Sequence, residues 1–341
     1  MRSVKLGSQG LEVSRIGLGC MGMSQSYGDL PPFEQCRDTL LRAVELGITL
    51  FDTADIYGAA AALYGQPGPG FGHNERLLAK ILEPHYGKVT IATRFGACLN
   101  EEGKIAIDGR PEYVRRACEA SLARLGTDRL DLYIYTRLDP TVPIEETVGA
   151  LGDLVKAGKV GYIGLSEMSG DTLRRAHAVH PITALESEYS LWARQHETGS
   201  ITACRELGVG FLAFSPLGRA MLTGALNDNR HFVPTDFRTV LPKFQGDNFE
   251  RNRRLVAQLE AMASARGVRP GQLALAWILA QGDFIVPIPG TKRIAFLEEN
   301  VCSLDIRLTP AETADLSGLF DPAAISGEAL SNQHGGKFID R

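Results

Sequence analysis

The sequence predicts an α/β fold, a (β/α)8 TIM barrel, and three observations carry this prediction. Eight short, almost wholly apolar runs alternate with segments of helical periodicity along the 341 residues, a pattern typical of parallel strands that are covered on both faces. No linker breaks the alternation, so we expect one domain over residues 1–341. The one G-x-G-x-x-G, Gly17–Gly22, starts inside the first run. The alternative fold, a doubly wound sheet, requires this dinucleotide-binding fingerprint directly after a strand. No G-x-G-x-x-G follows one of the runs, so the barrel is favoured.

Each apolar run is interpreted as one barrel strand that ends at small or polar residues. The runs cover Ile16–Leu18, Ile48–Phe51, Val89–Thr93, Leu130–Tyr135, Val160–Leu165, Thr183–Leu185, Gly210–Phe214 and Phe284–Ile288. Helical spacing fills the gaps between them. Cys36, Leu40 and Ala43 recur at helical intervals, and Pro111 is a typical first-turn residue before another periodic stretch. Leu255–Ala265 and Pro270–Ala280 predict two helices before the last strand, one more than the repeat needs.

Two segments lie outside the repeat. Val4–Leu6 and Leu11–Ser14 flank a glycine-containing turn, which is typical of a β-hairpin. We expect this hairpin to plug the N-terminal end of the barrel. The barrel core is then expected over residues 3–320. Pro322–Arg341 contains Gly327, Gly335 and Gly336 with little periodicity, and we expect a loop-like tail over residues 321–341.

Composition narrows the classes of function. The chain carries 36 basic and 40 acidic residues, a net charge of −4, whereas a nucleic-acid-binding protein is normally basic. The apolar runs are far shorter than the ~20 residues that span a membrane, and the first residues lack the apolar stretch of a signal peptide. The six cysteines form no C-x-x-C and no ligand set for a metal. We expect a cytoplasmic protein that acts on a small molecule, without nucleic-acid, membrane or metal partners; composition does not specify the oligomeric state.

In such a barrel, functional groups gather where the strands end. The residues at these ends include Asp52 with Tyr57, Arg94, Thr136 and Glu186. Six segments in register resemble the aldo-keto reductase family, and the resemblance as a whole runs from about residue 3 to residue 320. These segments are Gly17–Ser24, Phe51–Gly58, Gly164–Glu167, Phe214–Gly218, Ile288–Lys292 and Glu298–Asn300. The resemblance implies the same barrel and NADPH or NADP⁺ as the cofactor.

The resemblance also implies roles for individual residues. Tyr57 matches the family's general acid, and Asp52 matches the aspartate that helps to lower its pKa. A free tyrosine has a pKa near 10, so donation at neutral pH requires positive charge nearby. The positions that match the cofactor site are Gly22, Met23, Asp52, Ser166, Glu167, Glu186, Phe214, Ser215, Leu217, Gly218, Arg219, Thr291, Lys292, Glu299 and Asn300. Among them, Thr291 and Lys292 would meet the 2′-phosphate.

Three positions depart from the family pattern. Arg94 stands where the family has lysine, Thr136 where it commonly has histidine, and Glu186 where it has glutamine. We therefore expect an atypical catalytic set of Tyr57, Asp52, Arg94 and Thr136. The Gly- and Pro-rich segment Ala59–Gly72 follows Tyr57. Such a loop is either a solvent-exposed excursion or a functional lid, and its place after the second strand favours a wall of the pocket.

Three functions follow from this pattern. The first is an NADP(H)-dependent oxidoreductase that transfers hydride between the nicotinamide and a carbonyl or conjugated substrate. The second is a non-redox enzyme of specialised metabolism, a lyase or cyclase on the same barrel, because three positions near the nicotinamide change together. The third is a cofactor-sensing binding subunit, and no segment outside the barrel favours it.

Overall fold

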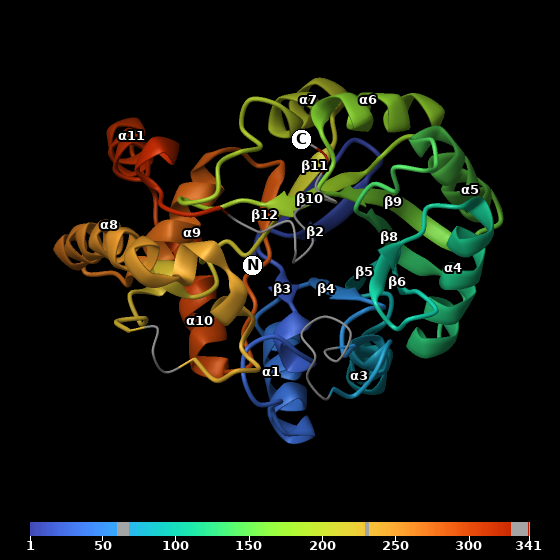
Figure 1. Cartoon of the computed structure of the whole chain (residues 1–341), viewed down its shortest axis with the longest axis horizontal. Helices are drawn as coiled ribbons and strands as arrows, with labels where there is room; N and C mark the ends of the chain where they lie inside the picture. The colour runs from blue at the N-terminus through green and yellow to red at the C-terminus, as the bar shows by residue number, and fades with distance from the viewer. Residues whose placement is uncertain (60–67, 229–231, 329–339, 341) are drawn as a thin grey trace.

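A computed structural model describes residues 1–59, 68–228, 232–328 and 340. Its central feature is a sheet of eight parallel strands that curls into a barrel (Figure 1). Neighbouring strands follow the order of the sequence: β3 (Leu18–Gly19), β4 (Leu50–Ala54), β5 (Thr90–Phe95), β8 (Leu130–Thr136), β9 (Val160–Ser166), β10 (Ala184–Glu188), β11 (Gly210–Phe214) and β12 (Ile285–Pro287). The (β/α)8 prediction is therefore confirmed.

The first and last strands close the barrel through glycine. The Gly17 N–H donates to the Pro287 carbonyl at 2.9 Å, and Gly19 forms a parallel bridge with Gly290. A Cβ on Gly19 would lie 2.9 Å from the Ile288 carbonyl oxygen. A larger residue at position 19 would therefore push these strands apart.

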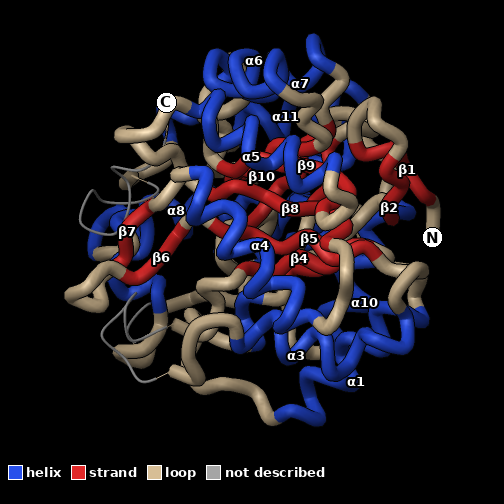
Figure 2. The backbone as a smooth tube through the Cα atoms, turned by 90° about the vertical axis from the view of Figure 1, so that its right-hand side faces the viewer, coloured by secondary structure: helices blue, strands red, loops and turns tan. Residues whose placement is uncertain are grey.

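Helices surround the strands (Figure 2). The helices of the repeat are α1 (Phe33–Glu45), α3 (His73–Leu82), α4 (Pro111–Leu125), α5 (Ile144–Lys156), α6 (Gly170–Val179), α7 (Ser200–Leu207), α9 (Pro270–Ala280) and α10 (Ile294–Cys302). Two further helices are α8 (Gly246–Ala265) and α11 (Pro310–Leu319). No helix in the described part of the chain combines the length and apolarity that crossing a membrane requires.

The N-terminal hairpin plugs the barrel, as the sequence predicts. Strands β1 (Ser3–Leu6) and β2 (Leu11–Ser14) pair antiparallel. Side chains of the hairpin pack in one buried cluster with side chains from the barrel interior: Val4, Leu6, Leu11, Val13, Leu50, Ala92, Leu132, Ile134, Ala184, Leu212, Val286 and Ile288. This end of the barrel is consequently filled with apolar side chains, and the polar residues gather at the opposite end.

The structure differs from the sequence prediction in three respects. Most strands extend one to three residues further than predicted, so that Asp52, Arg94, Thr136, Ser166 and Glu186 lie within strands rather than after them. Helix α8 begins nine residues before Leu255, and a short hairpin, β6 (Ala97–Leu99) with β7 (Ile105–Ile107), follows β5. Apolar periodicity misses the strand ends and the first turns of α8 because polar residues occupy them. It misses the hairpin because β6 and β7 are only three residues long each.

The tail is only partly described. Pro322–Ala324 forms a 3₁₀ turn, and Asn252 on α8 exchanges hydrogen bonds with the backbone of Ser326. Further along, the Asp340 carboxylate accepts from the backbone and hydroxyl of Ser169, at the start of α6. Most of the predicted loop-like tail and residues 60–67 of the Ala59–Gly72 segment lie outside the described residues.

Candidate active site

A cleft of about 2090 Å³ opens at the C-terminal ends of the strands. It extends without interruption from Tyr57 and Arg94 at one end to Thr291 and Asn300 at the other. Pockets for single drug-sized ligands measure about 300–1,000 Å³. This cleft therefore has room for an extended cofactor together with a second small molecule.

Three buried charged side chains meet at one end of the cleft. Arg94 from β5 lies between two carboxylates, with its Nη1 2.7 Å from Glu186 Oε1 on β10 and its Nη2 3.4 Å from Asp52 Oδ2 on β4. Asp52 and Glu186 are 3% and 0% exposed. One guanidinium at the edge of the cleft thus faces two carboxyl groups that are almost completely buried.

Burial and charge imbalance shift the pKa values in this triad. Burial raises the pKa of Asp52, although Arg94 opposes the shift. Burial also raises the pKa of Glu186 to about 8, against the opposing effect of Arg94 and with reinforcement from Asp52. Burial, reinforced by Asp52, thus makes Glu186 release its proton at a higher pH than a free glutamate does.

Tyr57 follows β4 and lines the same end of the cleft. The Cζ atom of Arg94 lies 5.1 Å from the centre of the tyrosine ring. Such a contact places positive charge close to the phenol. Thr136, at the end of β8, also lines the cleft and offers a hydroxyl.

An apolar wall stands beside Tyr57. Side chains from the loop after β3, the turn after β4 and the β6–β7 hairpin form it: Met21, Ile56, Ala97, Ile105 and Ile107. A reacting molecule at Tyr57 would therefore contact apolar surface on one side and the charged triad on the other.

A buried polar network connects β4 and β5 to the helices α3 and α4. Thr53 donates to the Asn74 side chain at 2.6 Å, and Thr93 donates to Glu75 at 2.7 Å. Glu75 is fully buried and forms an ion pair with Arg124 on α4. These contacts tie the two strands that carry Asp52 and Arg94 to α3 and α4.

The loop after β11 has an unusual backbone. Ser215 and the consecutive residues Gly218, Arg219 and Ala220 all have positive φ, between 49° and 76°. A Cβ on Gly218 would lie 2.6 Å from Trp192 Nε1. Glycine at 218 therefore permits both the left-handed backbone and the close approach of the indole.

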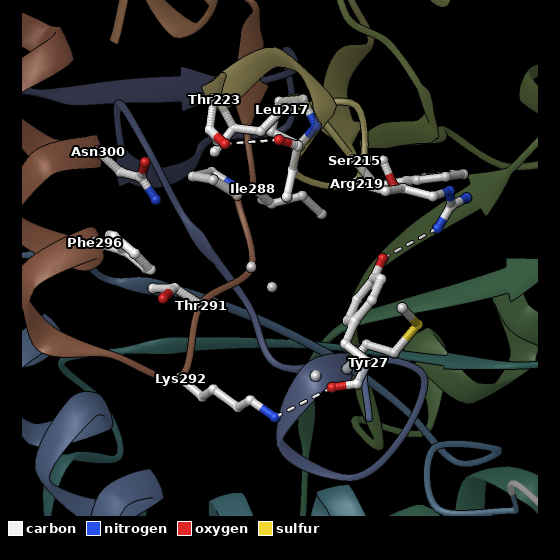
Figure 3. Close-up of a pocket in the computed structure, with 18 of the residues that line it drawn as sticks. Tyr27, Ser215, Leu217, Arg219, Thr223, Ile288, Thr291, Lys292, Phe296 and Asn300 are labelled. Atoms are coloured by element: carbon white, nitrogen blue, oxygen red, sulfur yellow. Dashed lines mark hydrogen bonds between the residues drawn. The ribbon is translucent and has the colours of Figure 1, made fainter. Parts of the chain in front are cut away.

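Tyr27 connects this loop to the end of β12 (Figure 3). Its hydroxyl accepts from Arg219 Nη1 at 3.3 Å, and its carbonyl accepts from Lys292 Nζ at 3.5 Å. Lys292 also donates to the Asp29 carbonyl at 2.8 Å, and burial lowers the pKa of the lysine. Arg293 packs over Phe296, with 4.6 Å from Cζ to the ring centre. Basic groups thus line the cleft from β11 to α10.

Most residues singled out in the sequence line this cleft: Gly22, Asp52, Tyr57, Arg94, Thr136, Phe214, Ser215, Leu217, Arg219, Thr291, Lys292, Glu299 and Asn300. Five do not line it: Met23, Ser166, Glu167, Glu186 and Gly218. The functional roles of all these residues stay predictions. The side chains of Glu167 and Glu186 contact other protein groups.

Glu167 is held by its neighbours. Its Oε1 accepts from the Glu188 backbone N–H at 2.8 Å, and its Oε2 accepts from Arg137 at 3.2 Å. Burial opposes ionisation of Glu167, but His196, Arg137 and the Glu188 N–H outweigh it and lower the pKa to about 2. Glu167 is therefore ionised, and protein groups hold both of its carboxylate oxygens.

Other lining residues escape analysis of the sequence. Tyr27, Phe296 and the β7 residues Ile105 and Ile107 line the cleft, but no spacing marks them. Arg137 also lines it and is adjacent to Thr136, so that its place at a strand end was an available signal. Across the described residues, no three His, Cys, Asp or Glu side chains are grouped so as to hold a metal ion.

Comparison with known proteins gives a family and a fold. A family model described as "Aldo/keto reductase family" matches residues 15–320. The glycerol dehydrogenase AKR11B4 from Gluconobacter oxydans has a similar structure, with a TM-score of 0.81 and 25% identity, covering 97% of this chain and 98% of that chain. The thermostable aldo-keto reductase Tm1743 gives 0.73 and 27%, covering 94% and 100%. Aldo-keto reductase AKR11C1 from Bacillus halodurans gives 0.73 and 24%, covering 98% and 99%, and supports the fold alone.

Proposed function

The chain belongs to the aldo/keto reductase family of oxidoreductases, and on this premise we propose that it transfers hydride between NADP(H) and a carbonyl or conjugated small molecule. The observation that carries the proposal is the single cleft that joins Tyr57 and Arg94 to Thr291 and Lys292. A nicotinamide dinucleotide is long enough to need both ends. We place this activity in the cytoplasm.

The residues along the cleft fit such a cofactor. A dinucleotide phosphate is polyanionic, and Arg219, Lys292 and Arg293 all line the part of the cleft beyond β11 and β12. Lys292 and the adjacent Thr291 would hold the 2′-phosphate, which favours NADP(H) over NAD(H). Phe296 is 44% exposed and offers a flat apolar face next to Arg293.

The triad and Tyr57 supply the proton chemistry. The cofactor, when bound, supplies the hydride. Tyr57 gives its proton to the carbonyl oxygen, and the Arg94 guanidinium beside the ring favours the phenolate that remains. Asp52 holds one side of the guanidinium. The Thr136 hydroxyl donates a hydrogen bond to the same carbonyl oxygen, and the apolar wall contacts the body of the substrate.

Cofactor binding and turnover test the proposal. Quenching of protein fluorescence measures the Kd values of NADPH and NADH, and absorbance at 340 nm follows NADPH consumption with aldehydes, ketones and enones. We expect tighter binding of NADPH and turnover that falls ~10²-fold or more in Tyr57→Phe. Tight NADPH binding without turnover of any carbonyl or conjugated substrate would contradict the proposal.

A second candidate is the non-redox enzyme. The observation that favours it is the engagement of Arg94 by two carboxylates, Asp52 and Glu186, at 3.4 and 2.7 Å, which differs from a single cation beside a tyrosine. A lyase or cyclase would convert its substrate after complete removal of nucleotide. The same panel of substrates, followed by mass spectrometry without cofactor, distinguishes the two candidates.

A further inference from the structure

The Arg94 side chain bridges distant strands of the barrel. It starts on β5, contacts Asp52 on the adjacent strand β4, and reaches Glu186 on β10. In the sheet, β8 and β9 lie between β5 and β10. The Arg94 side chain therefore reaches across the barrel interior, and the orientation of its guanidinium depends on both Asp52 and Glu186.

A forked cation is needed for this bridge. Arginine presents donors on two terminal nitrogens in a rigid plane, whereas lysine presents one compact ammonium group. Nη1 is 2.7 Å from Glu186, and Nη2 is 3.4 Å from Asp52. The shorter contact is the one with Glu186, so Glu186 is the stronger restraint on the plane of the guanidinium.

Among the described residues, the Glu186 side chain forms an ion pair with Arg94 and makes no side-chain hydrogen bond. It is 0% exposed and does not line the cleft. Neither of its carboxyl oxygens has a hydrogen-bond partner among the described residues, and Arg94 is its ion-pair partner. A buried carboxyl with a single charged contact is costly, which requires an explanation beyond packing.

We infer that Glu186 is a positioning residue, which fixes the Arg94 guanidinium against the ring of Tyr57 so that the proton donor, the cation and the glutamate act as one unit. This inference rests on the proposed function, in which Tyr57 donates the proton. Other charged groups also act on this unit: Asp52 and Asp55 from β4 and its turn, Arg137 after β8 and Glu167 after β9.

Two substitutions separate charge from position. Glu186→Gln and Glu186→Leu both remove the ionisable carboxyl group, but only glutamine keeps an oxygen beside Arg94 Nη1. In Glu186→Gln the guanidinium stays in place with less negative charge around it, so that Tyr57 ionises at lower pH than in the wild type. In Glu186→Leu the guanidinium is released, and Tyr57 ionises at higher pH than in Glu186→Gln.

The readout is the titration of the Tyr57 phenol by NMR of protein labelled with ¹³Cζ-tyrosine, with Tyr57→Phe to assign the signal. We expect the midpoints of the two variants to differ by about one pH unit. We also expect kcat to fall about tenfold or more in Glu186→Leu and to fall less in Glu186→Gln.

Glu75→Gln provides a matched control, because Glu75 is equally buried but is paired with Arg124, an arginine that does not line the cleft. Its substitution is expected to leave the Tyr57 midpoint unchanged. Equal Tyr57 midpoints in Glu186→Gln and Glu186→Leu, with both variants folded by circular dichroism, would overturn the inference. Because the NMR titration needs no substrate, an enzyme without turnover would refute the proposed function and still test Glu186.

Discussion

Two buried glutamates, Glu186 and Glu167, predict opposite pH dependences of stability. The pKa of Glu186 is raised to about 8 from the ordinary 4.5, mainly by burial. The folded protein therefore holds this proton more tightly than the unfolded chain does. The resulting stabilisation is fully present below pH 4.5 and is lost as the pH rises through about 8.

The magnitude follows from one proton. Between pH 6 and pH 8 the unfolded chain has released the Glu186 proton and the folded protein has kept it, so the free energy of unfolding falls by about 1.4 kcal/mol per pH unit. Glu186→Gln removes this contribution. We expect the stability of the variant relative to the wild type to rise by about 2–3 kcal/mol between pH 6 and pH 8 and to level off above pH 9.

Glu167→Gln is the control, since the pKa of Glu167 is lowered to about 2. Its stabilisation is present above pH 4.5 and is lost only as the pH falls through about 2. Urea unfolding followed by circular dichroism at pH 6, 7, 8 and 9 measures all three proteins. We expect Glu167→Gln to be less stable than the wild type by the same amount at each pH. A constant difference between Glu186→Gln and the wild type across this range would refute the reasoning for Glu186.

Three further predictions concern other parts of the molecule. Arg124→Met leaves the buried Glu75 carboxylate unpaired and should lower stability by about 3–5 kcal/mol in thermal or urea unfolding; no loss would show that Glu75 is neutral. Gly218→Ala places a methyl group 2.6 Å from Trp192 and should weaken NADPH binding at least tenfold in a fluorescence titration, whereas unchanged affinity would separate this loop from the cofactor. Lys292→Ala should weaken NADPH binding more than NADH binding, with Lys292→Arg retaining the preference; an equal effect on both cofactors would remove Lys292 from 2′-phosphate recognition.

The sequence by itself determined the barrel strands, most of the helices and the end of the barrel at which polar residues gather. Apolar runs and helical spacing depend on residues a few positions apart, so they can be recognised in the sequence before the fold is known. For the same reason the hairpin over Val4–Ser14 could be predicted, together with its place as a plug. The segment Phe51–Gly58 likewise placed Asp52 and Tyr57 at one strand end, where the structure has them at the cleft.

Only the tertiary structure decided which side chains meet. Arg94 and Glu186 are 92 positions apart in the numbering, and Tyr27 is 192 positions from the Arg219 that it contacts. Such pairs arise when the barrel closes, and no local pattern encodes them. The direction of each side chain at a strand end also depends on register, since a shift of one residue turns it to the other face. For this reason the sequence could not indicate that Glu167 would meet Arg137 or that Glu186 would meet Arg94.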